Sequence, residues 1–426
     1  MKKRHLLLGV LFLGVLFLAS LSTTVFISCS SDDNKNNTPT ICPPSAGYYI
    51  GEKEYKLDKL DEAESITIMT YKMPNVTSEL ADATALVFYP KTPKPADGYR
   101  VVVWTHGTVG VGDACAPSNN AIGNNFKVLA KTLLQEGYII IAPDYEGLGT
   151  PGIHPYLHLQ SEAYSATYAV KAFKEYYRDN LQGDWMVAGQ SQGGQASIGV
   201  AEYANEDTNF KGAVAGAPAS SLGTIILEVA PTALANIEIQ ENKINPPIPL
   251  DQRNSVNSYA TLLSYAALAG AGIKASDPNF DYTILFKERS KQFAPIAEGN
   301  NNECLGELRD AFKKDIITFM NENKSHKVMD YPGLDETIFK TNPTVIEFLK
   351  ISQPGTKKVD KPLLVIQGEA DTNVPAVITK GMVDKLKSLG SDKVELILVE
   401  NASHTEAIVQ KNAEVVAFIQ KYMPVK

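Results

Sequence analysis

A serine flanked by glycines is the feature of this sequence best suited to nucleophilic chemistry. Residues 189–193 read Gly-Gln-Ser-Gln-Gly and follow an apolar segment at 185–188 that is typical of a strand. A serine on a strained turn between a strand and a helix can hold its Oγ clear of the sheet only if its neighbours lack bulk, and Gly189 and Gly193 provide this. The helix that follows points its free amide N–H groups at the same place. We therefore interpret Ser191 as a nucleophile rather than as part of an ordinary turn.

A nucleophilic serine needs a base, because its hydroxyl is barely ionised at neutral pH. The chain has only 6 histidines, and His404 alone follows the last apolar segment, at 394–399. In α/β-hydrolases the chain order is nucleophile, acid, histidine, and this order also selects His404. The alternative interpretation is a histidine in a surface loop.

The acid that orients the histidine should stand just beyond a late strand. Asp371 follows the apolar segment 362–367 and is our candidate. Its carboxylate would accept the Nδ1–H of His404, which fixes the tautomer and stabilises the imidazolium. Glu369 is the alternative acid, and an exposed turn aspartate is the other reading of Asp371.

Two backbone N–H groups are candidates for stabilising an oxyanion. One belongs to Gln192, which directly follows the nucleophile. The other belongs to Thr108, which follows His106 and Gly107 in the loop after residues 101–105. His106 and Gly107 are also expected beside the pocket, where His106 braces this loop by hydrogen bonds rather than transferring protons.

Tyr145 follows another central segment, residues 138–142. Ligands of parallel sheets bind at the carboxyl ends of the strands, so Tyr145 is a candidate to line the acyl or alcohol pocket. A packed aromatic side chain that braces the nucleophile loop is an equally good interpretation of this residue.

These side chains can meet only above a parallel sheet. Short and nearly continuous apolar segments predict strands buried on both faces, at 100–105, 138–142, 185–188, 212–217, 362–367 and 394–399. Alternating segments predict edge strands at 65–71 and 84–89. Apolar residues at helical spacing predict intervening helices, at 124–136, 161–177, after 191, 376–389 and 405–423. Alternating strands and helices specify a mostly parallel α/β sheet, here with the α/β-hydrolase fold.

Residues 221–355 break this alternation, because they are poor in strands and rich in helices. We predict helices at 259–271, 305–322 and 343–351, in a helical cap inserted between two parts of the core, 48–220 and 356–426. The apolar segment 259–271 is shorter than the ~20 residues that a membrane span needs. We therefore expect it to cover a pocket or the core.

Four motifs together resemble the secretory lipase family of α/β-hydrolases, the group that includes fungal lipase A. They are His-Gly-Thr at 106–108, Asp-Ala-Cys-Ala-Pro-Ser at 113–118, Ala-Pro-Asp-Tyr-Glu-Gly-Leu-Gly-Thr-Pro-Gly-Ile-His-Pro-Tyr at 142–156 and Gly-Gln-Ser-Gln-Gly-Gly at 189–194. The resemblance runs from around residue 60 to the C-terminus and is strongest between residues 100 and 195. It implies serine carboxylester hydrolysis, a helical cap or lid between nucleophile and acid, and a disulfide between Cys115 and Cys304.

Composition excludes several other classes of protein. The chain has 426 residues, of which 44% are hydrophobic and 21% charged, which excludes a disordered or collagen-like chain. Its 40 Lys and Arg against 48 Asp and Glu give a net charge of -8, and no long basic run offers a groove for nucleic acid. We expect a monomer that binds a small-molecule or lipid ester and needs no metal or organic cofactor.

The amino terminus has the pattern of a bacterial lipoprotein signal. Basic residues at 2–5 precede an apolar run at 6–19, and Cys29 stands where the apolar stretch ends. We predict a signal peptide at 1–28, lipid modification of Cys29 and a flexible tether at 29–47. The protein would then be anchored by lipid to the outer membrane, with exposure at the cell surface as a further expectation. An uncleaved anchor or a simple secretory signal is the alternative.

Other functions fit the same residues. The same triad could remove acyl groups from polysaccharides or cleave peptides. A non-catalytic hydrolase fold that binds glycan or lipid at the cell surface belongs to a different class and is the third possibility.

Overall fold

The computed structural model describes residues 47–426. The predicted signal peptide at 1–28, Cys29, and the tether up to residue 46 lie outside the described residues. Cys42 lies outside them too.

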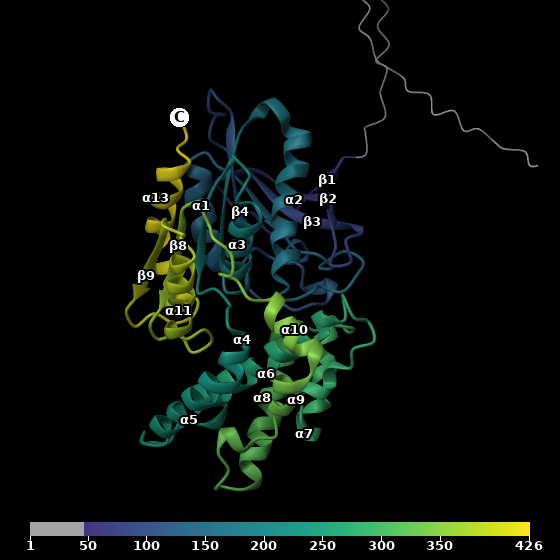
Figure 1. The fold of residues 1–426 in the computed structure, drawn as a ribbon, viewed down its shortest axis with the longest axis vertical. Coiled ribbons are helices and arrows are strands. Elements are labelled where there is room, and N and C mark those ends of the chain that lie inside the picture. Colours follow the sequence, from purple (N-terminus) through teal and green to yellow (C-terminus); the bar gives the residue numbers. More distant parts are fainter. Residues whose placement is uncertain (1–46) are drawn as a thin grey trace, which may run out of the picture. The chain divides into compact units, whose positions relative to one another are not determined.

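A 9-stranded sheet in the order β1-β2-β3-β5-β4-β6-β7-β8-β9 forms the centre of the described chain (Figure 1). Its strands are β1 Tyr49–Glu54, β2 Ala63–Pro74, β3 Leu80–Pro90, β4 Tyr99–Thr105, β5 Ile139–Pro143, β6 Leu181–Gln190, β7 Phe210–Gly216, β8 Leu363–Gly368 and β9 Val394–Val399. In this order, the neighbouring strands from β5 through β4 to β9 pair in parallel, whereas β1 with β2, β2 with β3 and β3 with β5 pair antiparallel. The predicted mostly parallel α/β sheet is therefore confirmed.

Helices cover both faces of this sheet, as the continuous apolar strands require. The helices α2, α3 and α11 pack against one face, and α1, α12 and α13 against the other. Their bounds are α1 Asn124–Gln135, α2 Leu159–Tyr177, α3 Gln192–Tyr203, α11 Ala376–Ser388, α12 Glu406–Gln410 and α13 Asn412–Tyr422. β5 is buried along its whole length between the two layers.

Two features of the core differ from the sequence prediction. β1 was not predicted, because it is a half-exposed edge strand whose alternation is weak. The single helix predicted at 405–423 is two helices, since Lys411 leaves the helical conformation with φ -103° and ψ 18°. The side chain of Lys411 instead forms an ion pair with Glu414 in the first turn of α13, at 2.7 Å.

The regular secondary structure between β7 and β8 is helical, apart from one isolated bridge between Phe286 and Leu334. Its longer helices are α5 Ala230–Glu241, α6 Asn254–Ile273, α8 Leu305–Glu322 and α10 Pro343–Ile351. Shorter turns of helix accompany them, at α4 Leu222–Thr224, the π-helix η4 Ile225–Val229, α7 Glu288–Lys291 and α9 Glu336–Thr341. We call this segment the cap, and Figure 1 shows its helices gathered beyond one end of the sheet.

The cap has its own apolar core. Leu263 on α6 and Phe312 and Ile316 on α8 are fully buried in it. The apolar segment predicted at 259–271 is part of α6 and packs against α8. Its apolar residues are thus used inside the cap.

The helical run Leu222–Glu241 was not predicted from the sequence. Among the described residues it alone is long and apolar enough to cross a membrane by length and composition, which is weak evidence by itself. Leu222, Ile225 and Ile226 of this run line a cavity beside Ser191. The apolar side chains at its start therefore have a role within the folded chain.

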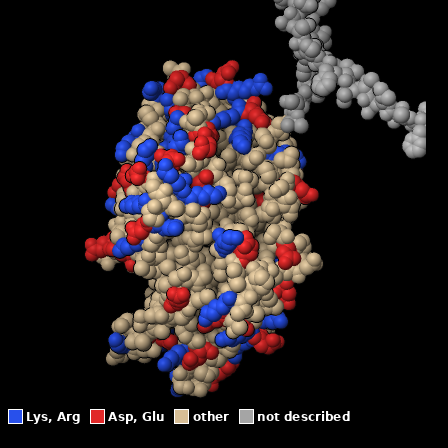
Figure 2. Space-filling model, in the orientation of Figure 1, with Lys and Arg blue, Asp and Glu red and all other residues tan. Residues whose placement is uncertain are grey.

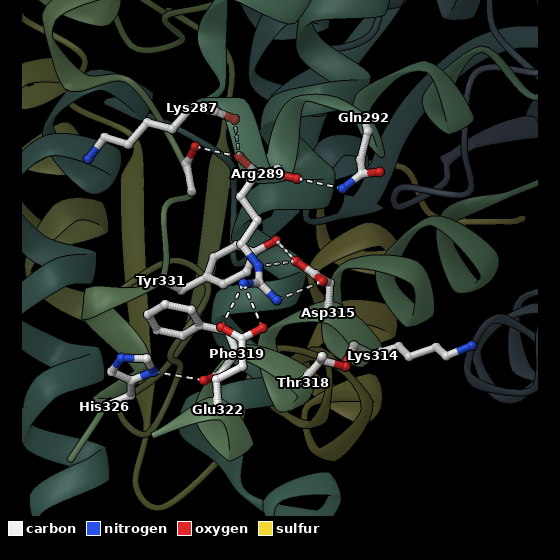
Figure 3. A network of polar contacts seen from close by, with 12 residues as sticks. Lys287, Arg289, Gln292, Lys314, Asp315, Thr318, Phe319, Glu322, His326 and Tyr331 are labelled. Carbon is white, nitrogen blue, oxygen red and sulfur yellow. Dashed lines mark hydrogen bonds and ion pairs between the residues drawn. The ribbon is translucent and has the colours of Figure 1, made fainter. Parts of the chain in front are cut away.

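On the face shown in Figure 2, charged side chains form mixed arrays rather than large areas of one sign. One mixed cluster links three elements of the cap (Figure 3). Arg289 of α7 pairs with Asp315 of α8 at 2.8 Å and with Glu322 at 2.9 Å. Its guanidinium lies over the rings of Phe319 and Tyr331, at 5.2 and 5.9 Å from their centroids. The cluster lies in the cap, where it holds the short α7 against α8.

Candidate active site

Ser191 sits on the sharp turn between β6 and α3. Its backbone has φ 61° and ψ -118°, a conformation that a side chain rarely adopts, and its N–H donates to Gly216 O at 2.8 Å. A side chain at Gly189 or Gly193 would collide with Thr105 of the neighbouring strand. The glycines predicted to flank Ser191 are thus required by the close approach of β4.

His404 and Asp371 reach Ser191 from two loops that follow neighbouring strands. His404, beyond β9, places its Nε2 2.8 Å from Ser191 Oγ. Its Nδ1 lies 2.7 Å from Asp371 Oδ2, beyond β8. Residues far apart in sequence meet here because β6, β7, β8 and β9 are successive parallel strands whose carboxyl ends share one edge.

Asp371 is held by several donors in addition to His404. Its Oδ1 accepts the backbone N–H groups of Asn373 and Val374 at 2.8 and 2.9 Å. Gln367 Nε2 donates to its Oδ2 at 2.9 Å, and Gln367 is itself fixed by Thr379. Glu369, the alternative acid, is exposed and makes no contact of this kind with His404.

The backbone N–H groups of Gln192 and Thr108 are the predicted oxyanion donors. Gln192 directly follows Ser191 as the first residue of α3, and Thr108 lies in the loop after β4 and lines the open groove described below. Neither N–H has an acceptor among the residues that the structure describes, so both are free to donate to a ligand. The side chain of Thr108 is fixed separately, by a hydrogen bond of 2.7 Å with Tyr156 Oη.

The side chain of Gln192 belongs to a buried network that the sequence analysis missed. Its Nε2 donates to His154 Nε2, which is 2.9 Å away, and to Glu162. The other ring nitrogen of His154 donates to Glu146 O at 2.9 Å, and burial lowers the pKa of His154 to about 3. The neutral ring that results can accept from Gln192. The only sequence signal for this network is Glu162, a glutamate on the buried face of α2.

His106 and Tyr145 brace the loop after β4. The ring nitrogens of His106 lie 2.7 Å from Gly107 O and 3.2 Å from Asp144 O, as expected for a bracing residue. Tyr145 is fully buried, packs its ring at a tilt against His106 and donates to His106 O at 2.9 Å. It is absent from the lining of both cavities beside Ser191, and its contacts are those of the bracing interpretation.

Comparisons with known proteins agree with this architecture. The model of the Secretory lipase family matches residues 121–241, which include Ser191, and that of the Prolyl oligopeptidase family matches residues 315–425, which include Asp371 and His404. No curated protein sequence matches the chain.

Solved structures extend the likeness to most of the chain. A ligand-bound form of the rice cell wall degrading esterase LipA from Xanthomonas oryzae is 17% identical, with 89% of this chain and 98% of that chain covered and a TM-score of 0.62. Lipase A from Candida antarctica in its closed state is 16% identical, with 89% and 82% covered and a TM-score of 0.61. This chain has the α/β-hydrolase fold. The resemblance to secretory lipases is confirmed, and the structures that share this fold include an esterase and a lipase.

Two cavities of this α/β-hydrolase meet at Ser191 and His404. The first, which we call the inner cavity, is narrow, with a volume of about 70 Å³, and runs from Ser191 into the cap. Apart from Ser191, His404 and Asn373, its lining is almost wholly apolar or aromatic, with side chains that include Leu222, Ile225, Leu262, Ala266, Phe339, Val345, Phe348 and Val374. An extended apolar group attached to a carbonyl at Ser191 would fit this environment.

The second cavity, which we call the open groove, lies on the other side of Ser191 and opens to solvent. Its volume is about 890 Å³, and its lining includes His106, Gly107 and Thr108. Much of its lining is polar, from side chains that include Asn120, Asn124, Asn125, Gln190, Thr261, Arg309, Asn373 and Asn412. The fold therefore offers an apolar environment on one side of Ser191 and a more polar one on the other.

A disulfide between Cys115 and Cys304 lies at the wall of the open groove, as the resemblance implied. It joins the loop after β4 to the residue that precedes α8, with a Cα–Cα distance of 5.6 Å. Beside it, Leu305 N donates to Val109 O at 2.8 Å. The hydrolase core and the cap are thus linked next to the candidate site.

Proposed function

We propose that the chain hydrolyses carboxylic esters with Ser191 as nucleophile, His404 as base and Asp371 as the orienting acid. The observation that carries this proposal is the continuous set of hydrogen bonds from Asp371 through His404 to Ser191, at 2.7 and 2.8 Å. Within this set, Ser191 and His404 line both cavities. A reacting carbonyl carbon can therefore reach the hydroxyl while its two substituents occupy different environments.

In the acylation step, Ser191 Oγ attacks the ester carbonyl carbon and His404 Nε2 takes the hydroxyl proton. Asp371 accepts the Nδ1–H of His404 throughout, so the Nε2 lone pair faces Ser191 and the imidazolium is stabilised. His404 then gives its proton to the alcohol oxygen as the bond from carbon to that oxygen breaks. The acyl group remains on Ser191.

The deacylation step repeats this sequence with water. His404 takes a proton from water, the water oxygen attacks the acyl carbon, and the bond to Ser191 Oγ breaks as Oγ regains the proton. In both steps the negative charge on the carbonyl oxygen would be stabilised by the free N–H groups of Gln192 and Thr108. No metal or organic cofactor takes part in this scheme.

The inner cavity supports an acyl group with an apolar chain. Among the described residues its walls offer almost no polar or charged partner. A peptide or a polar acyl group would therefore lose its hydration there without gaining hydrogen bonds in return. The open groove would then hold the alcohol and release it to solvent.

Hydrolysis of p-nitrophenyl acetate, butyrate and palmitate by the purified protein tests this proposal. We expect turnover by the wild type, and a loss of kcat on the order of 10⁶ in Ser191→Ala and His404→Ala. A folded wild type that hydrolyses none of the three esters, or a Ser191→Ala variant as active as the wild type, would overturn it.

The polar lining of the open groove favours a second candidate, in which the alcohol is part of a carbohydrate. The structurally similar LipA from Xanthomonas oryzae is described as a rice cell wall degrading esterase. Acetylated and feruloylated xylan would test this reading, and a peptide p-nitroanilide would test the peptidase alternative suggested by the prolyl oligopeptidase match. Faster release of acid from the xylans than from simple alkyl esters would favour the carbohydrate substrate.

We also propose that the protein is exported as a lipid-anchored monomer, as the amino-terminal sequence predicts. Cys29 would carry the lipid, and the segment that follows it would hold the hydrolase away from the membrane. Growth of bacteria expressing the chain with labelled palmitate should label the wild type but not a Cys29→Ser variant. Equal labelling, or none in either, would contradict the anchor.

A further inference from the structure

Three side chains form a wall that separates the inner cavity from a second hollow. Tyr156, Ile273 and Phe348 line the inner cavity, and the same three residues line the second hollow. This second hollow, which we call the outer pocket, has a volume of about 370 Å³ and opens at the surface of the cap. One layer of side chains therefore separates the space beside Ser191 from the exterior.

Each element of the wall faces both spaces. On α10, Val345 and Leu349 face the inner cavity, whereas Thr344 and Ile351 face the outer pocket. The end of α6 and the loop at 155–158 divide their residues between the two spaces in the same way. The two spaces are thus placed back to back along one wall.

The three wall residues differ in how firmly they are held. Tyr156 is fixed by the hydrogen bond of its hydroxyl to Thr108, at 2.7 Å, so it cannot move without disturbing the loop beside Ser191. Ile273 ends the long, buried helix α6. Phe348 lies on the short helix α10 and is held by apolar packing, with no polar contact of its own side chain.

We propose that Phe348, with Ile273, sets the longest acyl chain that the enzyme accepts, and that the outer pocket is the continuation of the acyl site for longer chains. This inference rests on the proposed ester hydrolysis. An acyl chain attached to Ser191 extends along the inner cavity until its end meets Phe348. When the side chain at position 348 is small, the chain passes through the wall, and its tail lies in the outer pocket against Pro155 and Ile351.

The experiment compares kcat/KM for p-nitrophenyl esters of eight and sixteen carbons in the wild type and in Phe348→Ala. We expect the ratio of long-chain to short-chain kcat/KM to rise at least about tenfold in the variant, because methylene groups gain an apolar site. Phe286→Ala is the matched control, since Phe286 is buried in the cap core but lines neither space. It should loosen the cap equally and leave the ratio unchanged.

Two further measurements keep the inference open to refutation. If Phe348→Ala does not fold, as judged by circular dichroism, Phe348→Leu and Ile273→Val remove less packing and should raise the same ratio to a smaller degree. Calorimetric titration measures the affinity for octanoate and palmitate without catalysis, in Ser191→Ala and in the double variant with Phe348→Ala. Only palmitate should bind more tightly to the double variant.

The outcomes separate the two proposals. If the wild type hydrolyses no ester but the Phe348 variant gains the expected affinity for palmitate, the proposed function is wrong, whereas the barrier at Phe348 is supported. If the enzyme hydrolyses esters normally but a folded Phe348 variant changes neither the ratio nor palmitate binding, the proposed role of Phe348 in limiting chain length is wrong. An equal rise of the ratio in Phe286→Ala would also overturn it, because general loosening of the cap would then explain the effect.

Discussion

Gln192 and Glu162 are joined by a hydrogen bond of 2.8 Å in a region that excludes solvent. Both N–H groups of the Gln192 side chain are used, one by Glu162 and the other by His154. Glu162 also accepts Leu157 N at 3.0 Å. Because Gln192 supplies a candidate oxyanion donor from its backbone, Glu162 acts on that donor through the side chain as a positioning residue.

Glu162→Ala should therefore lower kcat about tenfold for p-nitrophenyl butyrate and change KM little, since the donor acts on the transition state. Glu202→Ala is the matched control. Glu202 is also buried on this side of the sheet, but it accepts Thr356 N at 2.8 Å, at the far end of α3 from Gln192. A fall in kcat of the same size in both variants would show that Glu162 acts only through general stability.

The same carboxyl group should make the stability of the fold depend on pH. Burial raises the pKa of Glu162 from its ordinary value of 4.5 to about 8, against the opposing hydrogen bonds from Gln192 and Leu157. Between these pH values the folded chain keeps a proton that the unfolded chain releases. The free energy of unfolding should then fall with rising pH, by about 1 kcal/mol per pH unit from this group.

Urea unfolding of the wild type and Glu162→Gln between pH 5 and 8 measures this contribution. The amide cannot ionise, so the variant should lose less stability across the range than the wild type. Asp144, whose pKa burial raises to about 6, is present in both proteins and cancels in the comparison. Parallel stability curves would show that Glu162 does not carry the proton.

Arg289 should contribute to the stability of the cap (Figure 3). Arg289→Met removes the paired contacts to Asp315 and Glu322 and leaves the Asp315 carboxylate with Tyr331 as its remaining strong donor. We expect the free energy of unfolding to fall by about 2 kcal/mol. Lys340→Met, which removes an exposed pair with Glu336, should cost less than about 0.5 kcal/mol. Equal effects in thermal unfolding would contradict this assignment.

Asp371 should be needed for the tautomer of His404 rather than for binding. Asp371→Asn leaves the side chain the same size, but its amide can donate to Nδ1 and turn the Nε2 proton toward Ser191. We expect kcat to fall about 10⁴-fold with KM little changed. Steady-state kinetics with p-nitrophenyl butyrate would measure this, and a fall of less than tenfold would exclude the orienting role.

Sequence patterns could predict the parallel strands and the meeting of Ser191, Asp371 and His404, because each depends on local signals. Continuous apolar segments marked the strands, and only one histidine followed the last of them. The network of Glu162 and the wall at Phe348 could not be predicted in this way. They depend on which buried faces of α2 and α10 meet other elements, and that is decided by tertiary packing.

The break at Lys411 and the edge strand β1 were missed for a related reason. Neither interrupts a hydrophobic pattern strongly, since residues on both sides of Lys411 keep helical spacing and β1 is half exposed. Tyr145 shows the same limit within the site. Its position after a central strand was compatible with two roles, and only its burial against His106 separates them.

Labelling with a fluorophosphonate tests the central claim most directly, because this reagent reacts with a serine hydroxyl only when a base activates it. The account predicts one adduct per native chain, located by peptide mapping at Ser191, and no adduct in Ser191→Ala, in His404→Ala or in urea-unfolded protein. Labelling of the wild type and Ser191→Ala to the same extent, or of neither, would contradict it.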